Sequence, residues 1–257
     1  MSLSFTGFLV GALLLAIPYY IMLAMGLRLV SKFTRALLLL MVRLAVVAAL
    51  MGLLMKYDSP WLNIPFVLLM AVAAGWHTLR RARLKGLRLL VPLSTALAVA
   101  ALVFGLYVIF LEIRVTGFPG ATMLLPVVGL LLGHATLTVG KAVDTYYCGL
   151  AYHGRLYEYL RANGATHREA VDSFLRRAMT RALTSEISSM TAIVGGSAPV
   201  MMWMLLLTGK VDVVTAAGLQ LLFMIAMCAA SLSAVAAGLW MARRYSFDEY
   251  DRLREVK

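Results

Sequence analysis

The sequence predicts an all-α polytopic membrane protein that forms one transmembrane domain over residues 1–257. Hydrophobic residues make up 62% of the chain and charged residues only 14%, against roughly 25% charged in soluble domains. Several apolar runs reach the ~20 residues that a helix needs to cross a bilayer. These runs do not alternate polar with apolar residues, as the strands of an outer-membrane barrel would.

We expect about seven spans, separated by short polar segments. The first contains Pro18, which removes one helical hydrogen bond and can kink the helix, and the second contains Arg43. The start of the chain lacks the basic segment of a signal peptide, so we expect the first apolar run to be retained. The expected spans cover residues 5–27, 36–55, 61–78, 89–111, 122–143, 187–207 and 213–241.

Basic residues indicate how these spans are oriented. Of the 24 Lys and Arg residues, 20 lie in segments that share one side of the membrane if all seven spans cross it. Because positive residues collect in cytoplasmic loops, we expect the N-terminus outside and the C-terminus in the cytoplasm. The net charge of +12 therefore reflects topology, and nucleic acid is not an expected partner.

The longest polar segment, residues 144–186, lies between spans five and six and is expected in the cytoplasm. A turn signal at Asn163 and Gly164 divides two helical patterns. Thr166 and Glu169 then form an S/T-x-x-E capping box, which predicts the start of the second helix. Such a helix-turn-helix suits the transfer of mechanical work from a soluble partner. A solvated helical hairpin with no such role is the alternative.

The chain lacks the sequence motifs of common catalytic sites. It has no P-loop, no H-E-x-x-H, no G-x-S-x-G and no C-x-x-C, and its two cysteines are far apart. We therefore expect no enzymatic activity and no covalently bound cofactor in this chain. Any ATP hydrolysis would take place in another subunit.

The polar segment resembles the EAA loop of ABC transporter permeases, with Glu158 six positions before Gly164. A wider pattern is similar to the Fet-type iron-export permeases, a family that also includes the membrane subunit of a plant aluminium-tolerance transporter. The similarity covers most of the chain and is strongest in residues 125–237. It rests on LPVVGLLLGHATLTVG (residues 125–140), ANGAT (162–166) and SAPVMM (197–202).

The resemblance implies a homodimeric permease in the bacterial cytoplasmic (inner) membrane. Two copies of an ABC-type ATPase would bind it and supply ATP and Mg²⁺, and iron or a related metal ion would be exported. The residues that would contact the ATPase are Glu158, Asn163, Gly164, Ala165, Thr166 and Arg168. A non-metal substrate, for example a sugar nucleotide or a lipid, is the alternative. The sequence departs from the family pattern at His134, Ser185 and Val200, so this member either handles a different ion or differs there only in packing.

Candidate residues for the substrate path are ionisable or helix-breaking residues within the spans. Arg43 could extend to the lipid headgroups, pair with Asp144 or Glu186, or contact substrate. His134 is either a metal ligand or a hydrogen-bond partner of a neighbouring helix. Further candidates follow in span six: Met201 and Met202 as soft ligands, and Gly195, Gly196 and Pro199, which should loosen the helix.

Two other classes of function compete with an ABC permease. A membrane enzyme acting on lipids would need clustered acids or histidines, but the four histidines are dispersed. A gradient-driven carrier usually has an acidic residue at mid-membrane, and the expected spans contain none. Separately, the spacing of Gly129, Gly133 and Gly140 predicts close packing of span five against another helix.

Overall fold

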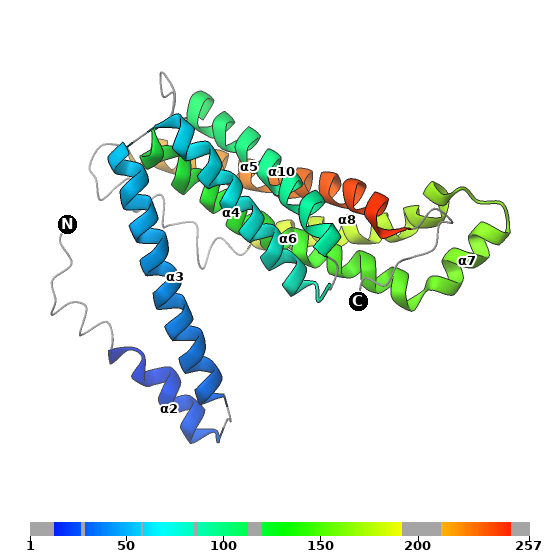
Figure 1. Cartoon of the computed structure of the whole chain (residues 1–257), viewed down its shortest axis with the longest axis horizontal. Coiled ribbons are helices and arrows are strands. Elements are labelled where there is room, and N and C mark those ends of the chain that lie inside the picture. Colours follow the sequence, from blue (N-terminus) through cyan, green and yellow to red (C-terminus); the bar gives the residue numbers. More distant parts are fainter. Residues whose placement is uncertain are drawn as a thin grey trace. The chain divides into compact units, whose positions relative to one another are not determined.

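The computed structural model describes residues 13–26, 29–57, 59–84, 87–112, 120–191 and 212–247. These residues fold into helices, which confirms the predicted all-α class (Figure 1). The chain divides into two compact units, residues 1–57 and 58–257, which are described separately. The first contains α2 (Ala16–Ala24) and α3 (Val30–Tyr57). The second contains α4 (Pro60–Arg81), α5 (Leu90–Tyr107), α6 (Ala121–Tyr152), α7 (Gly154–Ala162), α8 (His167–Thr191) and α10 (Val213–Ser246).

In the first unit, α2 and α3 meet through aromatic and polar side chains. The rings of Tyr19 and Phe33 pack edge to face with centroids 5.3 Å apart, and the Tyr19 hydroxyl lies 2.8 Å from the Thr34 hydroxyl. Most apolar side chains of α3 are exposed. An 18-residue stretch of this helix has a mean hydropathy of 2.6, which suits it to contact with lipid.

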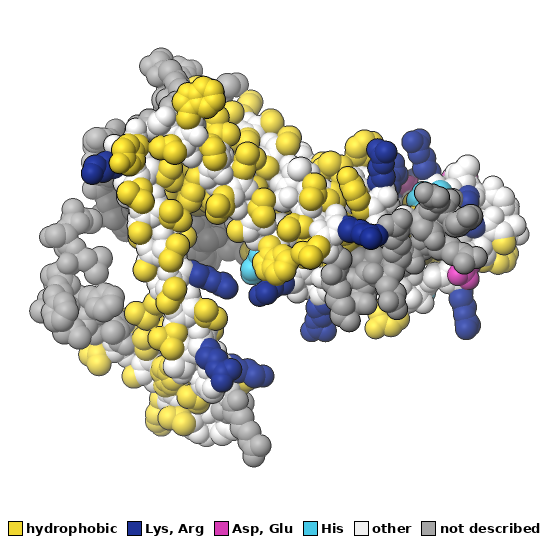
Figure 2. Space-filling view, in the orientation of Figure 1, with side chains coloured by type: hydrophobic (Ala, Val, Ile, Leu, Met, Phe, Trp, Pro, Cys, Tyr) yellow, Lys and Arg dark blue, Asp and Glu magenta, His cyan; other side chains and the backbone are white. Residues whose placement is uncertain are grey.

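The second unit is a bundle built around α6, which packs against α4, α5, α8 and α10. Val128, Leu131, Ala135 and Val139 of α6 are all buried, at 0–2% exposure. They recur three or four residues apart, so the buried stripe follows the helical period. The apolar side chains that remain exposed cover the outer face of the bundle, whereas most of the visible Lys and Arg side chains of this unit lie towards α7 (Figure 2).

Glycines allow the helices of this bundle to approach closely. A Cβ atom at Gly75 would lie 3.0 Å from Ser94 Cβ and 3.2 Å from its backbone, so α4 and α5 meet there almost backbone to backbone. Along α6, a Cβ at Gly129 or Gly140 would lie 3.1 Å from Met70 or Arg81 of α4, as the glycine spacing predicts. A Cβ at Gly133 would meet no described atom of another helix within 4 Å, so the predicted close packing is found at Gly129 and Gly140 but not at Gly133.

Five helices of the described chain are long and apolar enough to cross a membrane. They are Val30–Tyr57, Trp61–Arg81, Leu87–Phe110, Ala121–Tyr152 and Val213–Ser246, and each contains most of one predicted span. Much of predicted spans one and six lies outside the described residues. The total of seven spans and their orientation in the membrane therefore stay predictions. Several helices exceed the predicted bounds: α6 continues nine residues past residue 143, and α8 runs unbroken through the boundary expected at 186/187.

Candidate functional site

The predicted helix-turn-helix is formed by α7, a tight turn and the start of α8. At the end of α7 the Gly164 amide donates to the Arg161 carbonyl at 3.1 Å, and the Ala165 amide donates to the Leu160 carbonyl at 3.0 Å. This pattern is a Schellman motif, which needs a left-handed residue after the helix. Gly164 has that conformation, with φ +88°. The turn that the sequence indicates at Asn163 and Gly164 is thus present.

We call this helix-turn-helix, which consists of α7, the turn at Gly164 and the start of α8, the knob. The second helix of this knob starts at the predicted capping box. The Thr166 amide donates to Glu169 Oε2 at 2.8 Å, and the Glu169 amide donates to Thr166 Oγ1 at 3.3 Å. The two hydrogen bonds satisfy backbone groups that the helix start leaves free. The hydrogen bonds from Thr166 hold the pKa of the Glu169 carboxyl below its ordinary value.

An aromatic cluster holds this knob against the end of α10. The Tyr157 hydroxyl lies 2.9 Å from Nδ1 of His167, which joins α7 to α8. Phe247, directly after α10, packs on both side chains, with its ring centroid 5.6 Å from Tyr157 and 4.5 Å from His167. The knob is therefore connected to two helices of the bundle, α8 directly and α10 through Phe247.

The predicted coupling residues gather on this knob. Ala165 is half-buried, and the other five residues are exposed: Glu158, Asn163, Gly164, Thr166 and Arg168. They are within reach of a protein bound from outside the bundle. Whether an ATPase binds them is untested, and their coupling role stays a prediction.

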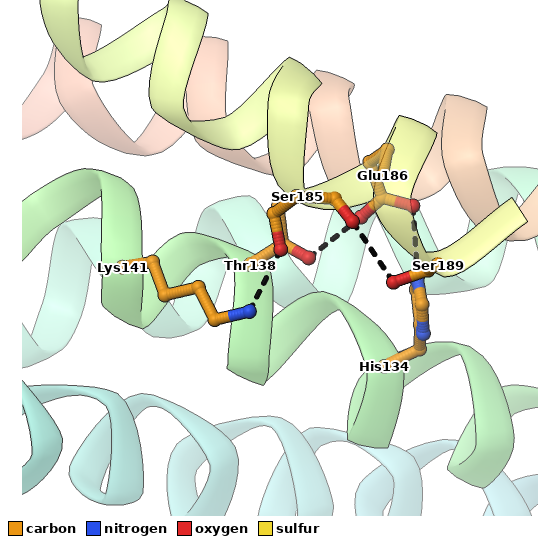
Figure 3. A network of polar contacts seen from close by, with 6 residues as sticks. All are labelled: His134, Thr138, Lys141, Ser185, Glu186 and Ser189. Atoms are coloured by element: carbon orange, nitrogen blue, oxygen red, sulfur yellow. Dashed lines mark hydrogen bonds and ion pairs between the residues drawn. The ribbon is translucent and has the colours of Figure 1, made fainter. Parts of the chain in front are cut away.

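Deeper in the bundle, His134 of α6 meets Glu186 of α8 (Figure 3). Nε2 of His134 lies 2.9 Å from Glu186 Oε2, and Thr138 donates to Glu186 Oε1 at 2.6 Å. His134 and Thr138 are four residues apart, so both project from the same face of α6. The Glu186 side chain is 3% exposed and that of His134 is 21% exposed. Both carboxylate oxygens are thus hydrogen-bonded away from water.

A third helix also contributes to this site. Ser231 of α10 is fully buried and lies near the Glu186 carboxylate. The site therefore lies where α6, α8 and α10 come together.

This arrangement offers an imidazole and a carboxylate, which are ligands for first-row divalent metals and also a proton donor-acceptor pair. Within the part of the chain that the structure describes, no group of three or more His, Cys, Asp or Glu side chains could hold a metal ion. One chain therefore supplies two strong ligands here, and a closed metal site would need others.

Sequence reasoning named His134 but considered Glu186 only as a possible partner of Arg43. The predicted span bounds leave Glu186 at the end of the polar segment 144–186, but the structure places its carboxylate against His134, in the middle of predicted span five. The available signal was the spacing of His134 and Thr138, two polar side chains on one face of an apolar helix.

The other candidate path residues are not joined to this site by the described structure. Arg43 is exposed on α3, in the first unit, so its predicted pairing with Asp144 or Glu186 is untested. The remaining candidates of span six lie outside the described residues: Met201, Met202, Gly195, Gly196 and Pro199.

Comparison with known proteins gives one match. Residues 5–247 match the model of the family described as "Uncharacterised protein family (UPF0014)". No curated protein and no solved structure shows significant similarity to the chain. The family match and the apolar helices together indicate a component of a membrane transporter. Because the match extends over nearly the whole sequence, the chain belongs to the UPF0014 family.

Proposed function

We propose that the chain is the permease subunit of an ABC transporter, a homodimer that exports iron or a related metal ion. Because this sequence has no P-loop, ATP hydrolysis takes place in a separate subunit. That subunit is present in two copies. The chain itself is then a transport subunit and not an enzyme.

The observation that carries this proposal is the continuity of α8. The helix begins at the exposed knob with His167 and reaches Glu186 without a break. At 1.5 Å per residue, this distance along the helix is about 28 Å. Two rigid caps fix the knob end, and the buried pair with His134 fixes the other. A displacement of the knob by an ATPase is thereby passed into the bundle.

The choice of a metal substrate rests on His134 and Glu186. In a homodimer the two chains together hold two imidazoles and two carboxylates, enough to complete a site for Fe(II) or a similar ion. Two copies of this pair would have to face each other across the dimer seam. A non-metal substrate remains the alternative for the same architecture.

A gradient-driven carrier is the second candidate, and Glu186 favours it. Buried acidic residues commonly mark ion pathways in such carriers. The sequence argument against a carrier rested on the absence of an acidic residue within the predicted spans, and the contact of Glu186 with His134 weakens that argument. The two candidates differ in whether an ATPase is required.

The test is affinity purification of the full-length protein in mild detergent, with identification of its partners and an ATPase assay with and without Fe(II). A P-loop ATPase that copurifies and responds to Fe(II) supports the proposal. An ATPase indifferent to metals keeps the architecture and removes iron. Transport without any ATPase identifies a carrier.

A variant of the knob tests the coupling role directly. Glu158→Arg should reduce recovery of the ATPase, or separate its turnover from transport, because Glu158 is exposed on α7. Asp172→Arg is the matched control, an equal change of charge at a half-buried position of α8 where Asp172 forms an ion pair with Arg176. Equal behaviour of the two variants would remove the coupling assignment.

A further inference from the structure

A polar hollow of about 360 Å³ opens between α6 and α8, next to the His134–Glu186 pair. Its lining carries two cationic side chains and four hydroxyls: Lys141, Arg181, Thr184, Ser185, Ser188 and Ser189. Lys141 and Arg181 are both exposed. Figure 3 shows Lys141 reaching from α6 towards Ser185 of α8.

The side chains that line this hollow have more hydrogen-bond donors than acceptor partners for them. Lys141 uses one of its three donors, at 2.8 Å to Ser185 Oγ, so the Ser185 hydroxyl keeps its own proton to donate. Neither the Arg181 guanidinium nor the Ser188 hydroxyl makes a side-chain hydrogen bond to any described residue. These uncommitted donors, two of them cationic, border one opening.

No described carboxylate balances these charges within the hollow. Glu186 follows Ser185 directly and also faces α6, but it does not line the hollow, and both its oxygens accept hydrogen bonds from His134 and Thr138. The lining therefore repels cations and favours an oxyanion. A phosphate group has several acceptor oxygens and is well matched by Arg and Lys together with hydroxyl donors.

The position of the hollow in the chain also fits a phosphate ligand. Lys141 is two residues from the expected cytoplasmic end of the span 122–143. Cationic side chains at that level meet the anionic headgroups of the cytoplasmic leaflet. Soluble phosphate compounds of the cytoplasm would reach the same opening.

We propose that this hollow is a binding site for an anionic phosphate group, either a phospholipid headgroup or a soluble phosphate compound. The proposal goes beyond the transport function and requires neither an ATPase nor a metal ion.

The test measures binding to the full-length protein purified in detergent. Native mass spectrometry quantifies bound dioleoylphosphatidylglycerol, with zwitterionic dioleoylphosphatidylcholine as reference, and calorimetry measures binding of inorganic phosphate. The variant Lys141→Gln/Arg181→Gln removes both cations. Lys32→Gln/Arg35→Gln is the matched control, since it removes one Lys and one Arg that are exposed on α3 in the other unit and expected on the same side of the membrane.

We expect the Lys141/Arg181 variant to lose about 30-fold in affinity for the anionic probe, since each cation near the headgroups contributes about 1 kcal/mol. The Lys32/Arg35 control should change affinity less than about threefold, because those residues lie outside the hollow. Selective loss of phosphatidylglycerol identifies a lipid site. Binding of inorganic phosphate that the variant loses identifies a soluble ligand.

A second variant keeps the charges of Lys141 and Arg181 and reduces only the volume of the hollow. Ser188→Trp should fill part of the hollow and weaken binding of the same probe, even if the double variant does not fold. The proposal is overturned if wild-type protein binds neither probe, if the control loses as much affinity as the Lys141/Arg181 variant, or if Ser188→Trp binds as wild type.

Discussion

The buried pair between His134 and Glu186 makes a quantitative prediction for stability. Truncation by Glu186→Ala leaves Nε2 of His134 and the Thr138 hydroxyl without their acceptor. Each buried donor left without an acceptor costs about 1–3 kcal/mol, and two are left here with His134 21% exposed, so we expect about 3 kcal/mol in total.

The part of this cost that belongs to the pair itself is measured by a double-mutant cycle. Hydrogen bonds between membrane helices couple by about 0.6 kcal/mol on average and reach about 1.7 kcal/mol. Because Glu186 is 3% exposed and accepts a charged or polar donor at each oxygen, we expect coupling of about 1–2 kcal/mol between His134→Ala and Glu186→Ala.

The same helix supplies a matched control pair. Arg176 and Asp172 form an ion pair at 2.7 Å, but their side chains are 81% and 46% exposed. An exposed pair four residues apart contributes about 0.3–0.5 kcal/mol. Both cycles can be measured by unfolding in mixed detergent micelles at one pH and salt concentration. If the His134–Glu186 coupling does not exceed the Arg176–Asp172 coupling, the buried site has no special energetic role and our reasoning fails.

Three further predictions concern the knob and the packing of the bundle. Gly164→Ala should lower the free energy of unfolding by about 1–2 kcal/mol and raise hydrogen exchange at the turn, because φ is +88° while the space around a Cβ is open. The control Gly154→Ala, also in open space but without positive φ, should show neither effect. Gly75→Ala should lower the free energy of unfolding by about 1–3 kcal/mol, because its Cβ would press on the backbone of α5, whereas Gly133→Ala should be tolerated. The lowered pKa of Glu169 means that its capping contribution is present at neutral pH and is lost as pH falls through that pKa. Hydrogen exchange at the start of α8, corrected for intrinsic rates, should therefore rise in acid. Glu169→Gln should remove this pH dependence.

The knob could be predicted from the sequence because its signals are local. Gly164 supplies the left-handed residue of the turn, and Thr166 with Glu169 closes a capping box within four residues. Each signal depends on neighbours in the chain and not on distant packing. The same holds for the apolar spans, whose length alone identifies them.

The pair of His134 and Glu186 could not be predicted in this way. The residues are 52 positions apart, and their contact depends on how far α8 extends and on its register against α6. The charge pattern placed residue 186 at the edge of the cytoplasmic segment, because Arg181 is the last arginine of that segment. A single continuous helix carries Glu186 past that edge, and no local signal in the sequence gives the length of such an extension.

The energetic cost of this pair favours a functional role for it. An apolar pair of similar volume would pack between α6 and α8 without burying a carboxylate. The same bundle already holds α6 through apolar contacts with four other helices, so the pair is not needed to bring the helices together. What the pair adds is a position at which displacement of α8 changes the surroundings of an ionisable group. Because α8 begins at the exposed knob and carries Glu186 near its other end, one helix would connect an event at the surface with a change at Glu186.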